Sequence, residues 1–196
     1  MKRQSLVAKA ARKFKCTTDS KHKLPVAPNL LEQDFNATAP NQKWAGNITY
    51  VATSEGWIYL AVVIDLYSRQ VVGWSMNTRI TATLVCDALS MALFRRGMPE
   101  GVIIHSNRGS QYCSKDYRDL IAAHNLKQSM SKKGNCWDES FFHSMKVEAV
   151  QYEPIMTREE MRQALFEYIE VDYNRTRRHN ALGYLSPVNF EKQYVA

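Results

Sequence analysis

The stretch KWAGNITYVATSEGWIYLAVVIDLYSRQVVGWSM, residues 43–76, decides the fold of this chain. It contains three runs rich in β-branched and aromatic residues, at 44–51, 57–65 and 70–76. The letters TSEG and YSR between the runs are typical of turns, which allow each run to fold back on the one before it. The pattern predicts an antiparallel meander of three strands.

Downstream of the meander, the apolar residues change from strand spacing to helix spacing. Residues 81–96 place Leu84, Ala88 and Leu89 on one helical face, and Gly97 follows as a stop signal. We further predict strands at 102–106 and 126–130, and helices at 114–124, 138–148 and 157–173. An antiparallel start followed by alternating helices and strands predicts one mixed five-stranded sheet flanked by helices, βββαβαβα. This is the element order of the ribonuclease-H-like fold, an α/β fold.

The length and composition favour one globular core preceded by an arm. The chain has 196 residues, of which 45% are hydrophobic and 23% charged, which are ordinary values for a folded domain. Residues 24–42 hold Pro25, Pro28 and Pro40 among polar residues and are typical of an extended linker. We therefore divide the chain into a basic arm and linker, 1–42, and a core domain with a C-terminal helix, 43–190.

The positive charge is concentrated in the arm. Residues 1–23 hold eight Lys or Arg and one Asp, so this segment alone has a net charge equal to the +7 of the whole chain. Such an arm can neutralise phosphates and release their counterions, so it indicates a polyanionic partner such as DNA. The candidate phosphate contacts are Lys9, Arg12, Lys13 and Lys15. A solvated terminus without a partner is the alternative.

Other classes of protein are excluded by what the chain contains. The four cysteines, at 16, 86, 113 and 136, form no C-x-x-C pair, which argues against a zinc knuckle or a disulfide framework. The longest apolar run, 57–64, is too short to cross a bilayer. We expect a cytoplasmic protein without a membrane partner.

Aromatic residues at strand and helix positions supply part of the expected core. They are Trp44, Trp57, Trp74, Phe141 and Phe142. We interpret His105 and His143 as packed or surface histidines, and Lys146 as a solvated lysine that could otherwise follow a DNA backbone.

Three polar residues mark places where chemistry could occur. Asn47 lies inside the first predicted strand, Asn107 follows the strand 102–106, and Glu139 opens the helix after a basic loop. In the predicted fold the first and fourth strands are neighbours and a helix crosses their ends, so these side chains could converge.

Several segments resemble the signatures of insertion-sequence transposases whose second reading frame encodes a core like that of retroviral integrases. The segments are KWAGNITY (43–50), IDLYSR (64–69), HSNRGSQY (105–112), GNCWDESFF (134–142) and YNRTRRHNALGY (173–184). The resemblance covers essentially the whole chain. It implies a polynucleotidyl transferase that binds DNA and carries out DNA integration, hydrolysing phosphodiesters and transferring strands at the ends of a transposable element.

The resemblance also implies a metal site. Three carboxylates, Asp, Asp and Glu, would hold two Mg²⁺ or Mn²⁺ ions that act on the attacking and leaving oxygens. Asn47, Asn107 and Glu139 occupy those catalytic and metal positions here, so two of the three acids are replaced by amides. At an effective dielectric of about 20, each lost charge weakens attraction to an ion at about 4 Å by about 4 kcal/mol. We expect the fold to survive, tight metal binding to be lost and catalysis to be impaired.

Two other acids could compensate for the lost carboxylates. Asp138 precedes Glu139 at a point where the chain is about four residues shorter than the family pattern, which could displace the glutamate. Asp65 ends the second strand and could be a further ligand, or it could cap the turn at 67–69. An active enzyme that uses asparagine ligands or one of these acids therefore remains the alternative.

The resemblance also suggests DNA contacts and protein partners. The candidate DNA contacts outside the arm are Lys132, Lys133, Arg175, Arg177, Arg178 and His179. The chain resembles a truncated core, because the family's helix-turn-helix would precede it. Its expected partners are a first-reading-frame or full-length transposase and further copies of itself. A second possible function is a remnant without catalysis that binds DNA or poisons the assembly of a full-length transposase.

Overall fold

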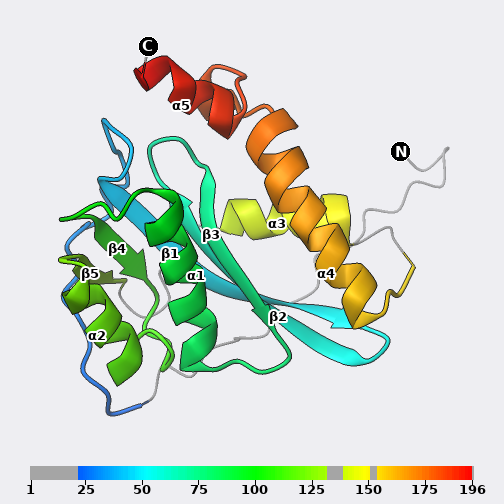
Figure 1. The fold of residues 1–196 in the computed structure, drawn as a ribbon, viewed down its shortest axis with the longest axis horizontal. Helices are drawn as coiled ribbons and strands as arrows, with labels where there is room; N and C mark the ends of the chain where they lie inside the picture. Colours follow the sequence, from blue (N-terminus) through cyan, green and yellow to red (C-terminus); the bar gives the residue numbers. More distant parts are fainter. Residues whose placement is uncertain (1–21, 132–138, 151–153, 196) are drawn as a thin grey trace, which may run out of the picture.

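The computed structural model describes residues 22–131, 139–150 and 154–195, and a sheet with helices on both faces forms its centre (Figure 1). The strands of this part of the chain are β1 (Lys43–Thr53), β2 (Gly56–Asp65), β3 (Val71–Asn77), β4 (Ile103–Ser106) and β5 (Lys127–Met130). The helices are α1 (Ala82–Arg95), α2 (Lys115–Ala123), α3 (Glu139–Ala149), α4 (Arg158–Glu167) and α5 (Pro187–Val195), with a π-helix η2 (Tyr168–Thr176) and a 3-10 turn η3 (Asn180–Leu182).

The order of the strands across the sheet is β3-β2-β1-β4-β5. Strands β1, β2 and β3 are antiparallel neighbours, as the turn signals predict. Strand β4 runs parallel to β1, and β5 runs parallel to β4. The predicted mixed sheet of five strands is thus confirmed within the described residues, and α1 and α2 are the crossover helices that its parallel part requires.

One face of the sheet packs against α1 and α2. Trp44, Ile48 and Ile104 on this face form one cluster with apolar residues of α1 and with Tyr117 and Ile121 of α2. Gly73 on β3 allows α1 to approach, because a Cβ atom built there would lie 2.2 Å from the carbonyl oxygen of Ala88.

The other face packs against α3, α4 and η2. Phe141 and Met145 of α3 and Leu165 of α4 lie in one buried cluster with Val62 and Ile64 of β2. The core positions predicted for Phe141 and Phe142 are confirmed, at 1% and 7% exposed. A capping box fixes the start of α4, because Thr157 and Glu160 accept hydrogen bonds from each other's backbone N–H.

The tryptophan predictions hold only in part. Trp44 is fully buried and Trp74 is half-buried, but Trp57 is 49% exposed, so the prediction is wrong for Trp57. Trp57 lies at the hairpin end of β2, opposite Ala52, where its ring packs edge-on against Tyr50 at 4.9 Å between centroids.

The helix predicted at 157–173 changes its geometry within its length. It is α-helical to Glu167 and then continues as the π-helix η2. Buried Asn174 in η2 accepts a hydrogen bond from the Val71 N–H at 2.9 Å and donates one to the Val71 carbonyl at 3.0 Å, which anchors η2 to β3. Helix α5 ends at Val195, beyond residue 190, where we predicted that the core domain with its C-terminal helix ends.

Residues 22–42 contain no helix or strand before β1 begins, and Leu31 within them is 3% exposed. The arm at 1–21 lies outside the described residues. None of the helices in the described ranges combines the length and apolarity needed to cross a membrane.

Candidate functional site

The two asparagines at the predicted catalytic positions lie together. Strand β4 is parallel to β1, with Ser106 opposite Gly46, so Asn107, directly after the end of β4, follows at the same level as Asn47 on β1. The Asn107 Nδ2 donates to the Asn47 Oδ1 at 3.3 Å. The structure therefore brings together these two residues, which are 60 positions apart in the sequence.

The oxygens of this pair already accept hydrogen bonds. The Asn47 Oδ1 also accepts from the Ile48 N–H, and the Asn107 Oδ1 accepts from the Gly109 N–H, each at 2.8 Å. Both side chains are half-buried and neither carries a charge. A pair of divalent cations requires anionic oxygens, so these two amides do not fit such a pair. Within 22–131, 139–150 and 154–195, no cluster of three or more His, Cys, Asp or Glu side chains could hold a metal ion.

Glu139 is the first residue of α3, and its side chain, like all of Asp138, lies outside the described part of the chain. The helix itself covers the face to which Asn47 points. Asn47 is directly opposite Val62 on β2, and directly opposed residues point to the same face. Val62 packs in one cluster with Phe141 of α3. The fold thus brings α3 to the face of the asparagine pair.

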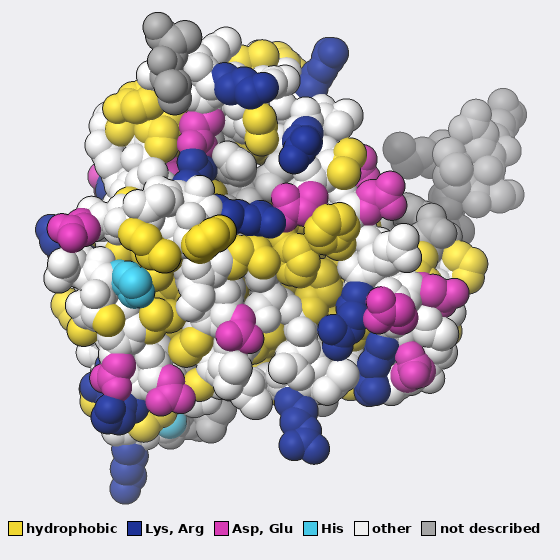
Figure 2. All heavy atoms as spheres, in the orientation of Figure 1, with side chains coloured by type: hydrophobic (Ala, Val, Ile, Leu, Met, Phe, Trp, Pro, Cys, Tyr) yellow, Lys and Arg dark blue, Asp and Glu magenta, His cyan; other side chains and the backbone are white. Residues whose placement is uncertain are grey.

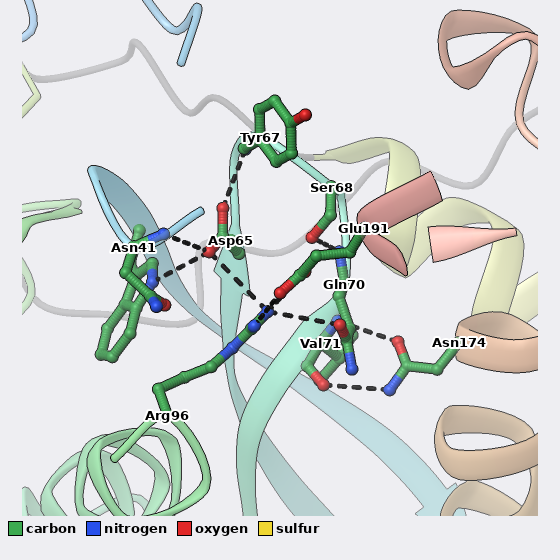
Figure 3. Close-up of polar contacts among 10 residues, drawn as sticks. Asn41, Asp65, Tyr67, Ser68, Gln70, Val71, Arg96, Asn174 and Glu191 are labelled. Atoms are coloured by element: carbon green, nitrogen blue, oxygen red, sulfur yellow. Dashed lines mark hydrogen bonds and ion pairs between the residues drawn. The ribbon is translucent and has the colours of Figure 1, made fainter. Parts of the chain in front are cut away.

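Asp65 lies away from the asparagine pair, in a cluster of polar contacts (Figure 3). It is fully buried and is paired with Trp44, three residues from Asn47 along β1, hence about 10 Å away and on the opposite face. Its carboxylate accepts from the backbone N–H groups of Asn41 at 2.8 Å and Tyr67 at 2.9 Å, and from the Trp44 indole at 3.3 Å. The turn-capping alternative is confirmed by the Tyr67 contact, and the structure does not bring Asp65 to the asparagine pair.

A cation completes the surroundings of Asp65. The Arg96 guanidinium lies 3.7 Å from the carboxylate and forms an ion pair with Glu191 of α5 (Figure 3). Burial raises the pKa of Asp65, while the two backbone donors and Arg96 oppose that shift. Asp65 thus joins β2, the linker, α1 and α5 in one polar cluster.

The predicted DNA contacts are distributed unevenly. Lys9, Arg12, Lys13, Lys15, Lys132 and Lys133 lie outside the described residues. Arg175 and Arg178 are exposed, whereas Arg177 and His179 are half-buried. These last two line a cavity of about 260 Å³ together with Arg69, which the sequence analysis did not single out. Arg69 belongs to the quoted segment IDLYSR, which is the one signal that could have drawn attention to it.

His179 has unusual surroundings within this cavity. Its ring stands edge-on to Tyr173 at 5.0 Å between centroids. Among the residues that the structure describes, its buried Nε2 atom has no hydrogen-bond partner. Burial, with smaller contributions from Arg177 and Arg69, lowers the pKa of His179. The imidazole is therefore held neutral beside two guanidinium groups.

Lys146 of α3 packs against an aromatic ring of β1. Its ammonium lies 5.2 Å from the centre of the Tyr50 ring, and Tyr50 is three residues beyond Asn47 on β1, hence about 10 Å away and on the opposite face. Burial lowers the pKa of Lys146. The interpretation of Lys146 as a solvated lysine is wrong, because its stem is half-buried against the ring. His105 and His143 are packed and exposed respectively, as expected.

A second hollow, of about 520 Å³, lies between α1, β3 and α4, where Figure 2 shows hydrophobic side chains gathered on one face. Trp74, Met76, Met91 and Phe166 line it. No predicted site residue within the described ranges lines this hollow. The asparagine pair and the basic cavity are thus the places where the predicted site residues meet.

Comparison with protein families identifies two matches along the chain. The family described as Integrase core domain matches residues 37–136, and a second integrase core domain family matches residues 139–195. Transposase InsF for insertion sequence IS3A, from Escherichia coli (strain K12), is 58% identical over 200 residues, which cover 100% of this chain and 69% of that protein. The insertion element IS600 uncharacterized 31 kDa protein, from Shigella sonnei, is 49% identical over 96% of this chain and 71% of its own length.

Solved structures support the same fold. A chain of the simian T-cell lymphotropic virus intasome in complex with the PP2A regulatory subunit B56 gamma has a TM-score of 0.66 at 17% identity, over 89% of this chain and 60% of that chain. The HTLV-2 integrase catalytic core domain, solved in complex with magnesium, has a TM-score of 0.62 at 18% identity, over 80% and 99%. These likenesses confirm the ribonuclease-H-like fold. With the family matches and the InsF identity, they show that this chain belongs to the integrase core domain family, as a homologue of the IS3 transposase InsF.

Proposed function

We propose that this chain is a DNA-binding integrase core of an insertion-sequence transposase in which metal-dependent hydrolysis and strand transfer are impaired. The observation that carries this proposal is the hydrogen-bonded pair of Asn47 and Asn107. Two-metal phosphoryl transfer requires anionic ligands that draw Mg²⁺ from water, and neutral amides supply no such charge.

The missing negative charge is large enough to prevent tight binding of divalent metal ions. The three positions implied by the family would carry three negative charges, and Asn47, Asn107 and Glu139 carry one. The missing charges weaken the attraction to each ion by several kcal/mol, at about 4 kcal/mol for each charge at about 4 Å. The Asn47 Oδ1 accepts two hydrogen bonds and would have to give up one of them to bind a metal.

The length of the chain adds a second reason for impairment. The InsF alignment runs over 200 positions and covers the whole of this 196-residue chain, which supports a loss of about four residues. The two family matches leave residues 137 and 138 between them, next to Glu139. Four residues of helix correspond to about 6 Å, enough to move a carboxylate out of coordination distance.

The DNA-binding part of the proposal rests on the distribution of cations. Exposed Arg175 and Arg178, and Arg177 and His179 in the basic cavity, belong to the stretch that resembles the family. The basic arm adds eight cations within residues 1–23. Phosphate contacts of this kind give affinity without reading sequence. We expect DNA, further copies of this chain and a full-length transposase as partners.

Metal calorimetry tests the impairment directly. The chain should show no measurable heat of Mg²⁺ or Mn²⁺ binding at millimolar metal, and the double variant N47D/N107D should bind. The control variant N36D/N125D adds the same two charges at exposed positions and should not bind. Tight binding by the unaltered chain would contradict the proposal.

A nicking assay tests the remaining alternative of an active enzyme. Supercoiled plasmid incubated with the chain and Mn²⁺ should stay intact. If the plasmid is nicked and the variant Glu139→Gln abolishes the nicking, the chain is active and the impairment is refuted.

A second candidate function, interference with a full-length transposase, is favoured by the extent of the InsF similarity. The 58% identity runs along the whole chain, so the surfaces used in assembly can persist while the metal ligands are lost. Co-expression should then lower the transposition frequency of an intact IS3 element. An unchanged frequency at equal protein levels would rule this function out.

A further inference from the structure

The hydrogen bonds of the asparagine pair fix which way each amide points. The Ile48 N–H donates to the Asn47 Oδ1, and the Gly109 N–H donates to the Asn107 Oδ1, each at 2.8 Å. Turning either amide over would bring its NH₂ group against a backbone donor and lose the bond. The NH₂ group of each side chain therefore faces away from these backbone donors.

The pair has N–H bonds that are left for a ligand. Each amide NH₂ group carries two N–H bonds, and Asn107 uses one of its own on the Asn47 Oδ1 at 3.3 Å. The hydrogen bonds that Asn47 makes to described residues all involve its Oδ1, so its NH₂ group remains a donor. Both side chains are half-buried, so a ligand in solution can reach them. Ionised carboxylates at these positions would only accept hydrogen bonds, whereas the amides donate them.

Arg108, the residue after Asn107, adds a positive charge at this place. It belongs to the segment HSNRGSQY (105–112), but the sequence analysis assigned it no role. Its side chain is half-buried, and its Nε donates to the Ser131 carbonyl at 2.9 Å. None of the ion pairs within 22–131, 139–150 and 154–195 includes Arg108. Its charge is thus not offset by a carboxylate of these residues.

Sheet geometry places the Arg108 guanidinium near the pair. Ser131 follows the last residue of β5 as Asn107 follows the last residue of β4, and these two last residues are opposite each other. The Ser131 N–H donates to the Ser106 carbonyl at 2.9 Å. Because neighbouring strands are about 4.8 Å apart, the Ser131 backbone lies about 5 Å from that of Asn107 and about 10 Å from that of Asn47. The contact with Ser131 thus holds the guanidinium within reach of a phosphate bound to the pair, or of the next phosphate along the strand.

The linker fastens the main chain at Arg108 and brings another cation there. The His22 Nδ1 accepts the Leu24 N–H at 3.1 Å, so the proton of the neutral ring is on Nε2, which donates to the Arg108 carbonyl at 2.8 Å. Lys23 follows His22 directly, is exposed, and belongs to no ion pair among the described residues. The basic arm is therefore joined to the core beside the loop that carries Asn107.

We propose that Asn47, Asn107 and Arg108 form an anion site that binds one phosphate of a DNA strand without a metal ion. The amide NH₂ groups donate to the phosphate oxygens, and the Arg108 guanidinium supplies the opposite charge. A site built of carboxylates repels a phosphate unless metal ions lie between them, whereas this site attracts a phosphate directly. This inference rests on the proposed DNA-binding function and assigns a DNA contact to the place where the metal site is lost.

The metal dependence of DNA binding tests the proposal. Fluorescence anisotropy of a labelled duplex, at constant ionic strength, should give the unaltered chain the same affinity in EDTA and in Mg²⁺. The variant N47D/N107D should bind about tenfold more weakly in EDTA, because carboxylates replace the donors, and Mg²⁺ should restore its binding. The control N36D/N125D adds the same charges at exposed positions and should stay within about twofold of the unaltered chain.

The salt dependence of DNA binding tests the part of Arg108. Arg108→Gln should weaken binding about fivefold and reduce the slope of log affinity against log salt by about one, because one phosphate contact is lost. Arg108→Lys keeps the charge and should keep the slope, which separates loss of charge from loss of the Ser131 contact. The exposed Arg79→Gln is the matched control and should leave affinity and slope unchanged. Equal slopes for Arg108→Gln and Arg79→Gln would overturn the assignment of Arg108.

Inorganic phosphate distinguishes failure of this inference from failure of the proposed function. Titration of the isotope-labelled chain with phosphate in EDTA, followed by NMR, should shift the side-chain NH₂ signals of Asn47 and leave those of exposed Asn36 unchanged. If DNA binds but N47D/N107D and N36D/N125D have equal affinities in EDTA, the anion site is overturned and DNA binding stands. If DNA does not bind while phosphate shifts the Asn47 signals, the anion site stands and the proposed function fails. If neither ligand binds, both fail.

Discussion

Asn47 and Asp65 lie on neighbouring strands of the same sheet, and their surroundings differ in charge and burial. Asp65 is fully buried, keeps its carboxylate, and is surrounded by three N–H donors and the Arg96 guanidinium. Asn47 is half-buried and neutral, and its amide partner Asn107 is neutral as well. The chain therefore retains an acid where the fold depends on it, and has amides at the two positions that we propose correspond to metal-binding acids. Opposite substitutions at these two places test this contrast.

The largest effect is expected at Asp65. Asp65→Asn removes the charge that faces Arg96 and turns an amide NH₂ toward buried donors, which should lower the free energy of unfolding by about 3 kcal/mol. The reverse substitution, Asn47→Asp, should change it by less than about 1 kcal/mol, because the new carboxylate keeps the Ile48 N–H and Asn107 amide as donors. Urea unfolding of both variants measures the difference. Equal effects would remove the contrast between the two regions.

A smaller effect, dependent on pH, is expected at His105, two residues before Asn107. Burial lowers the pKa of His105 from 6.5 to about 4. The unfolded chain therefore binds this proton at a higher pH than the folded chain does. As the pH falls from about 6.5 to about 4, protonation favours the unfolded chain and the free energy of unfolding decreases. The loss should amount to about 2–3 kcal/mol. Urea midpoints between pH 4 and pH 7 should show a weaker pH dependence in His105→Gln and an unchanged one in the exposed control His143→Gln.

The smallest effect is expected at Lys146. Lys146→Gln removes the ammonium from the face of Tyr50 and should cost about 0.5–1 kcal/mol. A double-mutant cycle with Tyr50→Leu isolates this pair, and the exposed Lys192→Gln serves as the control. A coupling energy near zero would mean that the Lys146 side chain is held by its other contacts.

The sheet could be predicted from the sequence because its signals are local. The runs of β-branched residues and the turns between them define β1, β2 and β3 to within a few residues, and the pairing of β1 with β4 is expected from the ribonuclease-H-like fold that the order of elements predicts. The meeting of Asn47 and Asn107 follows from that pairing. Neither inference needs knowledge of side-chain packing.

Other features depend on packing between distant segments and could not be predicted. The change from α4 to the π-helix η2 leaves the apolar spacing nearly helical and is anchored by Asn174 on Val71, 103 residues away. The basic cavity joins Arg69 to Arg177 through the docking of η2 and α3. Trp57 has an apolar side chain in a strand pattern, but it lies at a hairpin end, so its exposure depends on what covers it.

The segment before β1 has a consequence for the behaviour of the protein at high concentration. The Pro28 carbonyl accepts the Met130 N–H at 3.1 Å, and the Leu30 N–H donates to the Ser129 hydroxyl at 2.9 Å, so this segment runs beside the outermost strand, β5. It thereby occupies a backbone donor that would otherwise be open to a foreign strand, and its proline offers no N–H of its own. By covering β5, the segment before β1 therefore also hinders aggregation through pairing with strands of other molecules.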